Sequence, residues 1–389
     1  MLGVAWPSIR GEFGVEVGQL GWLLLSGMVG YLASSFISGW LVHRIGIGLL
    51  LTVSSGLILG VMAIFALAGS WWMIVGVGVF AGLGAGAIDA GSNVFAARRF
   101  SPAVVNWLHA CYGLGAMLGP TLMLAALAGG AGWRTGYAVL AGMLAAMTVA
   151  FAVTARRWDG RAEGVPDDAG QSPAGNGDGR FRAALRQPVV WGGMAWFFVY
   201  TGIEVTAGQW TYTLLVEERG FSPRRSGIAV SLYWGCLTVG RIAFGFAAAR
   251  WSAAVILRIC TLLMPPCAAV LWLSPNPWAS IASMAILGFL LAPMFPLMIS
   301  LTSLRVGAVD AAHAVGFQIS AAALGVAVLP ALVGAAAQQR GLAAIGPCLL
   351  VECGALLAIY ALLARRHGSR RSAALPTCDQ SRYAAGSIP

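Results

Sequence analysis

Long apolar runs separated by short polar loops make up most of this 389-residue chain. A helix needs about 20 apolar residues to cross the hydrocarbon core of a bilayer. Eleven runs reach this length, and each is too long and too rich in Gly and Ala to be a strand. The pattern predicts an all-α membrane protein with full spans at about residues 18–41, 47–69, 71–96, 103–128, 133–155, 188–214, 226–249, 253–273, 278–301, 311–336 and 341–364.

The first nine residues, MLGVAWPSI, are apolar but too short to cross a membrane. They have neither the basic start nor the small-residue cleavage site of a signal peptide. We expect residues 1–9 to be the last turns of a first helix whose beginning is missing, through a start codon assigned too late or a truncated gene. Sequencing the native N-terminus tests this hypothesis, and an active protein that starts at Met1 would refute it.

A polar segment containing GVPDDAGQSPAGNGDG has no apolar period and is expected to be a flexible linker. With the remnant counted, six spans precede it and six follow, which predicts two parallel repeats. The motif G-x-x-x-x-R supports the repeat, because it ends the second span at Arg44 and the eighth at Arg250. The predicted parts are an N-terminal bundle at 1–155, a cytoplasmic linker at 156–187, a C-terminal bundle at 188–365 and a disordered tail at 366–389.

Charged residues make up 10% of the chain and hydrophobic residues 59%, whereas soluble domains carry about 25% charged residues. The net charge is +10, and all 24 basic residues are arginines that lie mostly in loops between apolar runs. With the linker placed in the cytoplasm, seventeen arginines fall on its side and six fall opposite: Arg10, Arg134, Arg219, Arg224, Arg225 and Arg340. This asymmetry predicts a multi-pass protein of the bacterial inner membrane with both termini in the cytoplasm, and it argues against a nucleic-acid partner.

The seven cysteines are scattered and form no CxxC pair, so we expect neither a disulfide nor a metal site. The chain also lacks an HExxH motif and a GxSx serine with a plausible base, so we do not expect an intramembrane enzyme. We expect no cofactor, and a monomer in a lipid bilayer.

Four charged residues lie inside predicted spans: Asp89, Glu204, Arg241 and Glu352. A charge at the bilayer centre costs at least ~2.5–3.5 kcal/mol, so such a residue persists only where it is paired or lines a cavity. We expect Arg241 to form a structural ion pair near the cytoplasmic gate. Glu352 has no partner visible in the sequence and is predicted to be structural.

The fourth and fifth spans carry polar groups that share helix faces. Asn93 follows Asp89 at i+4, and His109 follows Asn106 at i+3. Asp89 could bind and release a proton or contact the solute, and His109 titrates in the physiological range. The alternatives are a buried acid that stays protonated and holds two helices together, and a hydrogen-bonded structural histidine.

The seventh span places Glu204 beside Gln209 and Trp210. A carboxylate, an amide and an indole are the groups that recognise a sugar, through hydrogen bonds to hydroxyls and stacking on C–H groups. The alternative is an aromatic belt at the lipid interface, because most of the 15 Trp in the chain must be structural.

Glycines and prolines predict close helix contacts and bends inside two spans. Gly119 and Pro120 allow close approach and a bend in the fifth span. Pro293 and Pro296 each lack a backbone donor, so the tenth span should be broken or kinked, as transporter helices are at binding sites and gates. Gln318 in the eleventh span is a further candidate pathway group.

The segment Gly39-Trp-Leu-Val-His43-Arg44-Ile-Gly46 resembles the loop signature G-x-L-x-D-R-x-G of the major facilitator superfamily, with His43 at the position of the Asp. Further blocks resemble the fucose–galactose–glucose:proton symporter group, in order along both halves: Ala87-Ile-Asp89-Ala-Gly-Ser-Asn93, Asn106-Trp-Leu-His109, Tyr200-Thr-Gly-Ile-Glu204, Gly240-Arg241 and Ala292-Pro293-Met-Phe-Pro296.

The resemblance implies two six-helix bundles around a central cavity. It also implies a role for Asp89 in proton coupling and solute binding, with Asn93 beside it. His109 and Glu204 stand where the best-known member of the group has Gln, so the solute need not be fucose.

The predicted function is secondary transport of a small polar solute, a sugar or related metabolite, coupled to protons by alternating access. Asp89 would titrate together with Glu204 or His109. One alternative is efflux of drugs or metabolites by proton antiport. Another is a non-transporting sensor, or a transporter disabled by the missing helix.

Overall fold

The computed structural model describes residues 1–373 except 100–101, 160–185, 249 and 307. Within these ranges the side chains of residues 36, 38–40, 43, 94, 97–99, 102–110, 159, 303–306, 308–313 and 365–373 lie outside the description. The described residues are almost entirely helical and contain no strand. This confirms the predicted all-α fold.

The helices follow one another with short connections. The first half of the chain forms α1 (Leu2–Phe13), η1 (Val17–Gln19), α2 (Leu20–Leu67), α3 (Trp71–Arg99), α4 (Pro102–Ala128) and α5 (Gly132–Asp159). The second half forms α7 (Pro188–Thr213), the π-helix η3 (Leu214–Glu218), α8 (Pro223–Ala247), α9 (Ala253–Leu273), α10 (Pro277–Leu291), α11 (Met294–Val306), α12 (Ala308–Arg340), η4 (Leu342–Ala344) and α13 (Ile345–Ala373).

Two predicted breaks occur where special residues require them. The 48-residue α2 is interrupted at Gly46, whose φ of 78° and ψ of 162° are accessible to glycine at little cost. It therefore contributes two candidate spans, Val17–Ser35 and Arg44–Leu67. The tenth predicted span is divided into α10 and α11 at Ala292 and Pro293, which confirms the expected break. Pro296 lies in the first turn of α11, where a missing N–H is tolerated.

Within the described part of the chain, ten helical segments are long and apolar enough to cross a membrane. Helix α7, with 26 residues, corresponds to the predicted span at 188–214 and is not among these ten. Its apolar sequence is interrupted by Thr201, Glu204, Thr206, Gln209 and Thr211. These residues are buried or half-buried, so the polar groups of α7 face other helices rather than lipid.

The residues expected to be a helix remnant form an ordered helix, α1. It ends at Gly14, whose φ of 61° is the left-handed conformation common after a helix. Trp6 is fully buried and packs against Trp71, with ring centroids 5.1 Å apart. A Cβ at Gly3 would lie 2.5 Å from the backbone oxygen of Gln209, so α1 touches α7 directly. Helix α1 therefore joins the two halves of the molecule.

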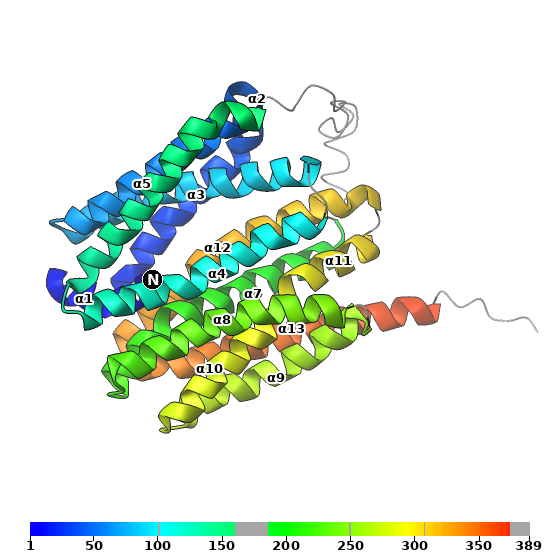
Figure 1. Cartoon of the computed structure of the whole chain (residues 1–389). Helices are drawn as coiled ribbons and strands as arrows, with labels where there is room; N and C mark the ends of the chain where they lie inside the picture. Colours follow the sequence, from blue (N-terminus) through cyan, green and yellow to red (C-terminus); the bar gives the residue numbers. More distant parts are fainter. Residues whose placement is uncertain (100–101, 160–185, 249, 307, 374–389) are drawn as a thin grey trace, which may run out of the picture.

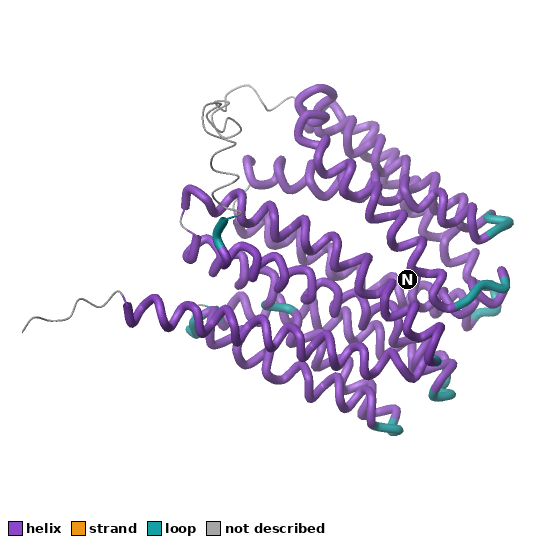
Figure 2. The backbone as a smooth tube through the Cα atoms, turned by 180° about the vertical axis from the view of Figure 1, so that it is seen from behind, coloured by secondary structure: helices purple, strands orange, loops and turns teal. Residues whose placement is uncertain are grey.

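The two halves pack differently. Helices α3 and α5 each pack on α2, and α7 to α13 form a second group. Helix α4 packs mainly against α8, and the start of α2 lies against the end of α12. In Figures 1 and 2 the first group diverges from the second toward the end at which α5 ends and α7 begins, called here the linker end. The opposite end, at which α1, α7 and α12 end, is called the far end.

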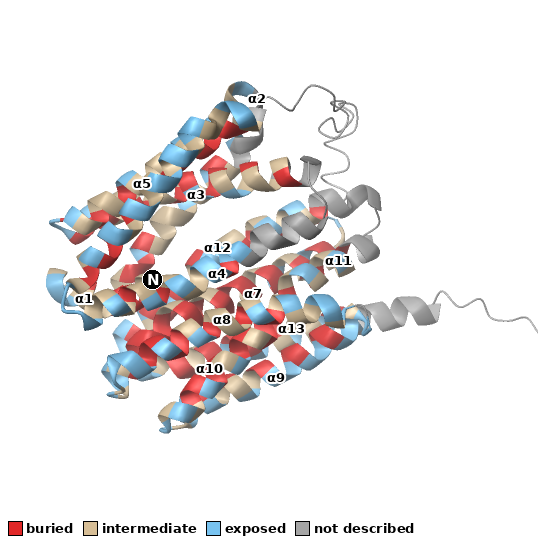
Figure 3. Ribbon diagram, in the orientation of Figure 1, coloured by how far each residue is buried: buried red, intermediate tan, exposed pale blue. Residues whose placement is uncertain are grey.

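Exposed side chains on the outside of the bundle are largely apolar. Figure 3 shows buried residues concentrated among α7 to α13 and around α1, whereas α5 is exposed along much of its length. Val149 and Val153 of α5 are 61% and 78% exposed. Apolar faces of this extent belong in lipid. The protein is a multi-pass membrane protein.

Candidate functional site

Two neutral groups donate hydrogen bonds to the carboxylate of Asp89 in α3, and no described cation forms an ion pair with it. The hydroxyl of Tyr31, from α2, donates to Oδ2 over 2.5 Å, and Nδ2 of Asn93 donates to Oδ1 over 2.9 Å. Asn93 thus shares the face of Asp89 as the spacing predicted. Asp89 is exposed and pairs with no Arg among the described residues. The described donors to its carboxylate are therefore both neutral groups.

Glu204 of α7 has a different environment because a cation lies next to it. Nη2 of Arg241, from α8, lies 3.8 Å from Oε2, and the hydroxyl of Tyr200 donates to the same oxygen. The hydroxyl of Tyr233 donates to the backbone oxygen of Glu204 over 2.8 Å. Glu204 is only 8% exposed. Arg241 was expected to pair near a gate, and its carboxylate partner is the candidate site residue Glu204 itself.

Tyr112 of α4 connects these two clusters. Its side chain interacts electrostatically with Asp89 of the first half and with Glu204 and Arg241 of the second half. Tyr112 is 62% exposed although it lies inside a candidate span. Tyr112 is therefore within electrostatic range of acids from both halves. We call Tyr31, Asp89, Asn93, Tyr112, Tyr200, Glu204 and Arg241 the central polar cluster.

Trp210 and Gln209 lie toward α1 and α12. The indole of Trp210 is fully buried, and its Nε1 donates to the backbone oxygen of Pro330 over 2.8 Å. A Cβ at Gly334 would lie 2.6 Å from the Trp210 ring. Gln209 is half-buried beside Gly3. These contacts favour a packing role for Trp210, and its place is the helix interior rather than the lipid belt considered from the sequence.

Gln318 is also enclosed by helices. It is 1% exposed, and its Nε2 donates to the hydroxyl of Thr302 over 2.8 Å. A Cβ at Gly193 would lie 2.1 Å from the same Nε2. Gln318 thus joins α12 to α11 and α7, which favours packing over a pathway role.

Glu352 has a partner that the sequence did not reveal. The hydroxyl of Thr206 of α7 lies 3.3 Å from its Oε1.

Among the predicted gating residues, Gly46 adopts the positive φ described above, and Arg44 is exposed. Gly119 lies next to Met1, and Pro120 is buried within α4. The tight contact between α4 and α8 occurs at another glycine, Gly113, where a Cβ would lie 2.4 Å from Oγ1 of Thr238. The side chains of His43, Asn106 and His109, and the surroundings of Gly39, lie outside the described residues.

Four tyrosines of this region were not singled out from the sequence: Tyr31, Tyr112, Tyr200 and Tyr233. A local signal existed for two of them. Tyr200 precedes Glu204 by four residues, and Tyr112 follows His109 by three, so each shares a helix face with a candidate. Tyr31 and Tyr233 come from other helices, so only the tertiary structure reveals them.

The halves contact each other at the far end. Arg10 of α1 forms an ion pair with Glu217 of η3. A Cβ at Gly18 would lie 2.3 Å from Oε1 of Gln338, near the end of α12. Thr121 of α4 hydrogen-bonds Ser231 of α8 over 3.0 Å. These contacts join the first half to the second half on the side away from the linker end.

Arg134 and Arg219 form hydrogen bonds with residues near helix ends at the far end of the molecule. Arg134 donates to Glu12 over 2.6 Å, and Nε1 of Trp133 donates to Glu12 over 2.7 Å. Partial burial acts to raise the pKa of Glu12, but these hydrogen bonds and the charge of Arg134 outweigh it and lower that pKa.

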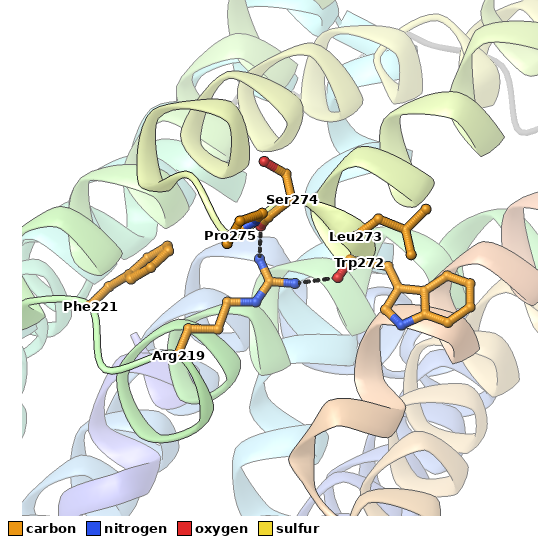
Figure 4. Close-up of a pocket in the computed structure, with 6 residues that line it drawn as sticks. All are labelled: Arg219, Phe221, Trp272, Leu273, Ser274 and Pro275. Atoms are coloured by element: carbon orange, nitrogen blue, oxygen red, sulfur yellow. Dashed lines mark hydrogen bonds between the residues drawn. The ribbon is translucent and has the colours of Figure 1, made fainter.

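In the second half, Arg219 donates to the backbone oxygens of Trp272 over 2.8 Å and Ser274 over 3.2 Å, in the shallow pocket that Figure 4 shows. The residues that line this pocket come from the end of α9 and from the loops after η3 and α9. The pocket is therefore a surface feature of the far end and not part of the central polar cluster.

Known proteins resemble this chain in sequence and in fold. The family model described as Major Facilitator Superfamily matches residues 1–330. The glucose/mannose transporter GlcP of Bacillus subtilis is 22% identical over 333 residues, which are 84% of this chain and 81% of that protein. Bypass of stop codon protein 6 of Saccharomyces cerevisiae is 24% identical over 242 residues, 58% of this chain. That match spans 48% of the yeast protein's length.

Solved structures share the fold along nearly the whole chain. The nucleoside transporter NupG superposes with a TM-score of 0.71 at 14% identity, covering 94% of each chain. The E. coli fucose:proton symporter FucP superposes with a TM-score of 0.63 at 13% identity, covering 92% of this chain and 93% of that one. At these identities the likeness concerns the fold alone.

Proposed function

This chain belongs to the Major Facilitator Superfamily, and from that membership we propose that it moves a small polar solute, a sugar or related metabolite, together with protons. The proposal includes alternating access between the bundles at residues 1–155 and 188–365. It also includes a bacterial inner membrane with both chain termini in the cytoplasm, because arginines concentrate on the linker side.

The observation that carries the proposal is the central polar cluster. Asp89 of one half and the Glu204–Arg241 pair of the other half are both within electrostatic range of Tyr112. A solute held there contacts both halves, so its binding can be linked to their relative movement. Carboxylate and amide groups bind hydroxyls, and the phenol rings present faces for the C–H groups of a sugar ring.

Asp89 is the proton-carrying group in this proposal. Its described partners are neutral, so it becomes uncharged when it binds a proton. A neutral acid costs less to enclose than a carboxylate, which favours closure of the halves only when a proton is bound. Glu204 differs from Asp89 because the positive charge of Arg241 lies beside it and can compensate a carboxylate there.

The arrangement of contacts supports a conformation open toward the linker end. The Arg10–Glu217 pair and the Gly18–Gln338 contact close the far end, whereas the helix groups diverge toward the linker end. Alternating access then requires these far-end contacts to separate while the linker end closes.

Two of the similar proteins support a sugar as the solute, because one is named a glucose/mannose transporter and the other a fucose:proton symporter. NupG is named as a nucleoside transporter, and a nucleoside also carries a sugar. The shared chemistry is a ring with several hydroxyl groups.

Transport by purified protein in liposomes tests the proposal. Uptake of labelled glucose, mannose, fucose and a nucleoside is measured with and without an inward proton gradient, for the wild type, Asp89→Asn and Glu218→Gln. Glu218 is an exposed carboxylate of η3 and serves as the matched control. We expect gradient-driven accumulation of at least one sugar by the wild type and the control. Asp89→Asn should retain exchange of solute between the two sides but lose the effect of the gradient.

Two results would contradict the proposal. If Asp89→Asn accumulated solute as the wild type does, Asp89 would not couple protons. If an outward-directed solute flux were driven by the inward proton gradient, the protein would be an antiporter for efflux.

A further inference from the structure

Glu352 is a buried acid outside the central polar cluster. It lies on α13 inside the candidate span Leu342–Ala364, and it is 7% exposed. The hydroxyl of Thr206 donates to Oε1 over 3.3 Å. The other oxygen, Oε2, is buried and has no hydrogen-bond partner among the described residues.

Helix α7 separates this acid from Glu204. Thr206 follows Glu204 by two positions, which places the two side chains about 200° apart around the helix. Glu204 therefore faces Arg241 on α8 while Thr206 faces α13. Glu352 and the central polar cluster lie on opposite sides of one helix.

No described charge compensates Glu352. Helix α13 packs against α7, α9, α12 and η4. The titratable groups that these elements and α8 bring to its vicinity are Cys267 of α9, Tyr233 of α8 and Arg340 of α12, besides Cys348 and Cys353 of α13 itself. Arg340 interacts electrostatically with Cys348 but forms no described ion pair with Glu352. An ionised carboxylate here would be a buried charge without a counter-charge, which is strongly unfavourable.

We propose that Glu352 is a second proton-binding site, which is protonated in this conformation and gives up its proton in another conformation of the transport cycle. A metal cation fits this site less well, because it needs several oxygen ligands. Among the described residues, only Thr206 brings a hydroxyl to the carboxyl group of Glu352. Glu352 lies seven residues into α13, about 10 Å from its first residue at 1.5 Å per residue. Half-buried Cys348 lies one turn nearer to that end. The proton therefore enters from the far end, opposite to the end at which the halves diverge.

Infrared spectroscopy of the full chain in lipid tests this site without any solute, and so independently of the proposed function. The signal is the C=O stretching band of protonated carboxyl groups, which ionised carboxylates lack. We expect a band at neutral pH that is lost in Glu352→Gln and retained in Asp89→Asn and Glu218→Gln. Thr206→Val should shift the frequency of this band, because it removes the hydrogen bond to Oε1 of Glu352. A band unchanged in Glu352→Gln would overturn the site.

The exchange of the proton is tested by titration and by transport. The band should disappear as the pH is raised while the protein stays folded, and Na⁺ at constant pH should not remove it. A band that persists at every pH and in the presence of solute would show a permanently neutral structural acid and would overturn the proposal.

In liposomes, Glu352→Gln should exchange solute as the wild type does but move one proton fewer per solute. An unchanged ratio would sink the second site while leaving the role of Asp89 intact, and loss of coupling in Asp89→Asn is scored separately.

Discussion

Asp89 and Glu204 are both acids inside the membrane, yet their surroundings differ. Asp89 is exposed and accepts hydrogen bonds from the neutral groups of Tyr31 and Asn93. Glu204 is 8% exposed and lies beside Arg241. An acid with neutral partners can change protonation, whereas an acid paired with a guanidinium is held as a fixed charge. The two halves therefore contribute acids with different surroundings to one cluster.

The largest expected effect comes from removing the cation of the fixed pair. Arg241→Leu leaves Glu204 buried without compensation, which should lower the free energy of unfolding by about 3 kcal/mol. Arg224→Leu, at an exposed position of the same helix, is the control and should be neutral. Denaturant unfolding in detergent measures both. The double variant Glu204→Gln/Arg241→Leu should recover part of the loss. Wild-type stability in the single variant would show that Glu204 does not depend on Arg241.

A smaller effect is expected at the neutral partners of the titrating acid. Tyr31→Phe removes a hydrogen bond to the ionised form of Asp89. The pH at which gradient-driven uptake is half-maximal should rise by about one unit, because a hydrogen bond to a charged group contributes about as much free energy as one unit of pH. Tyr137→Phe, a buried tyrosine of the same half outside the cluster, is the control. An unshifted profile in Tyr31→Phe would separate Asp89 from the proton step.

Trp210→Phe distinguishes packing from solute contact. The loss of the hydrogen bond to Pro330 should lower the free energy of unfolding by about 1 kcal/mol and leave KM for the solute unchanged. Uptake kinetics and denaturant unfolding measure the two quantities. A raised KM with unaltered stability would return Trp210 to the solute pathway.

The smallest effect concerns Glu12, far from both acids. Its folded-state pKa lies below its usual value of 4.5. The stabilisation is therefore fully present above pH 4.5 and is lost as the pH falls through the lowered pKa. Thermal unfolding should show the wild type slightly more stable than Glu12→Gln at pH 7. The two should converge below the lowered pKa. A difference that grows on acidification would have the opposite sign and contradict this assignment.

Apolar run length predicts most of the fold, because bilayer thickness sets helix length. Local chemistry predicts the break at Pro293, since it depends on the backbone of that residue. The interruption at Gly46 was expected only as the gap between two apolar runs. Spacing along one helix predicts the Asn93–Asp89 hydrogen bond. These features are all determined within about one helical segment.

The partners across helices could not be predicted in this way. Tyr31 lies 58 residues before Asp89, and Thr206 lies 146 residues before Glu352. Periodicity alone also does not distinguish a polar face toward a passage from one toward another helix. This is why Trp210 and Gln318 resembled pathway residues in the sequence, whereas the structure encloses them among α7, α11 and α12.

The most direct test of proton binding at Asp89 is a measurement of proton uptake when the solute binds. Protein in weakly buffered detergent solution with a pH-indicator dye is mixed with the solute identified by transport. If Asp89 takes up the proton, the solution becomes more alkaline with the wild type and with Glu204→Gln. Its pH stays unchanged with Asp89→Asn, provided that this variant still binds the solute. A full signal from Asp89→Asn, or its loss only in Glu204→Gln, would contradict the division of roles between the two acids.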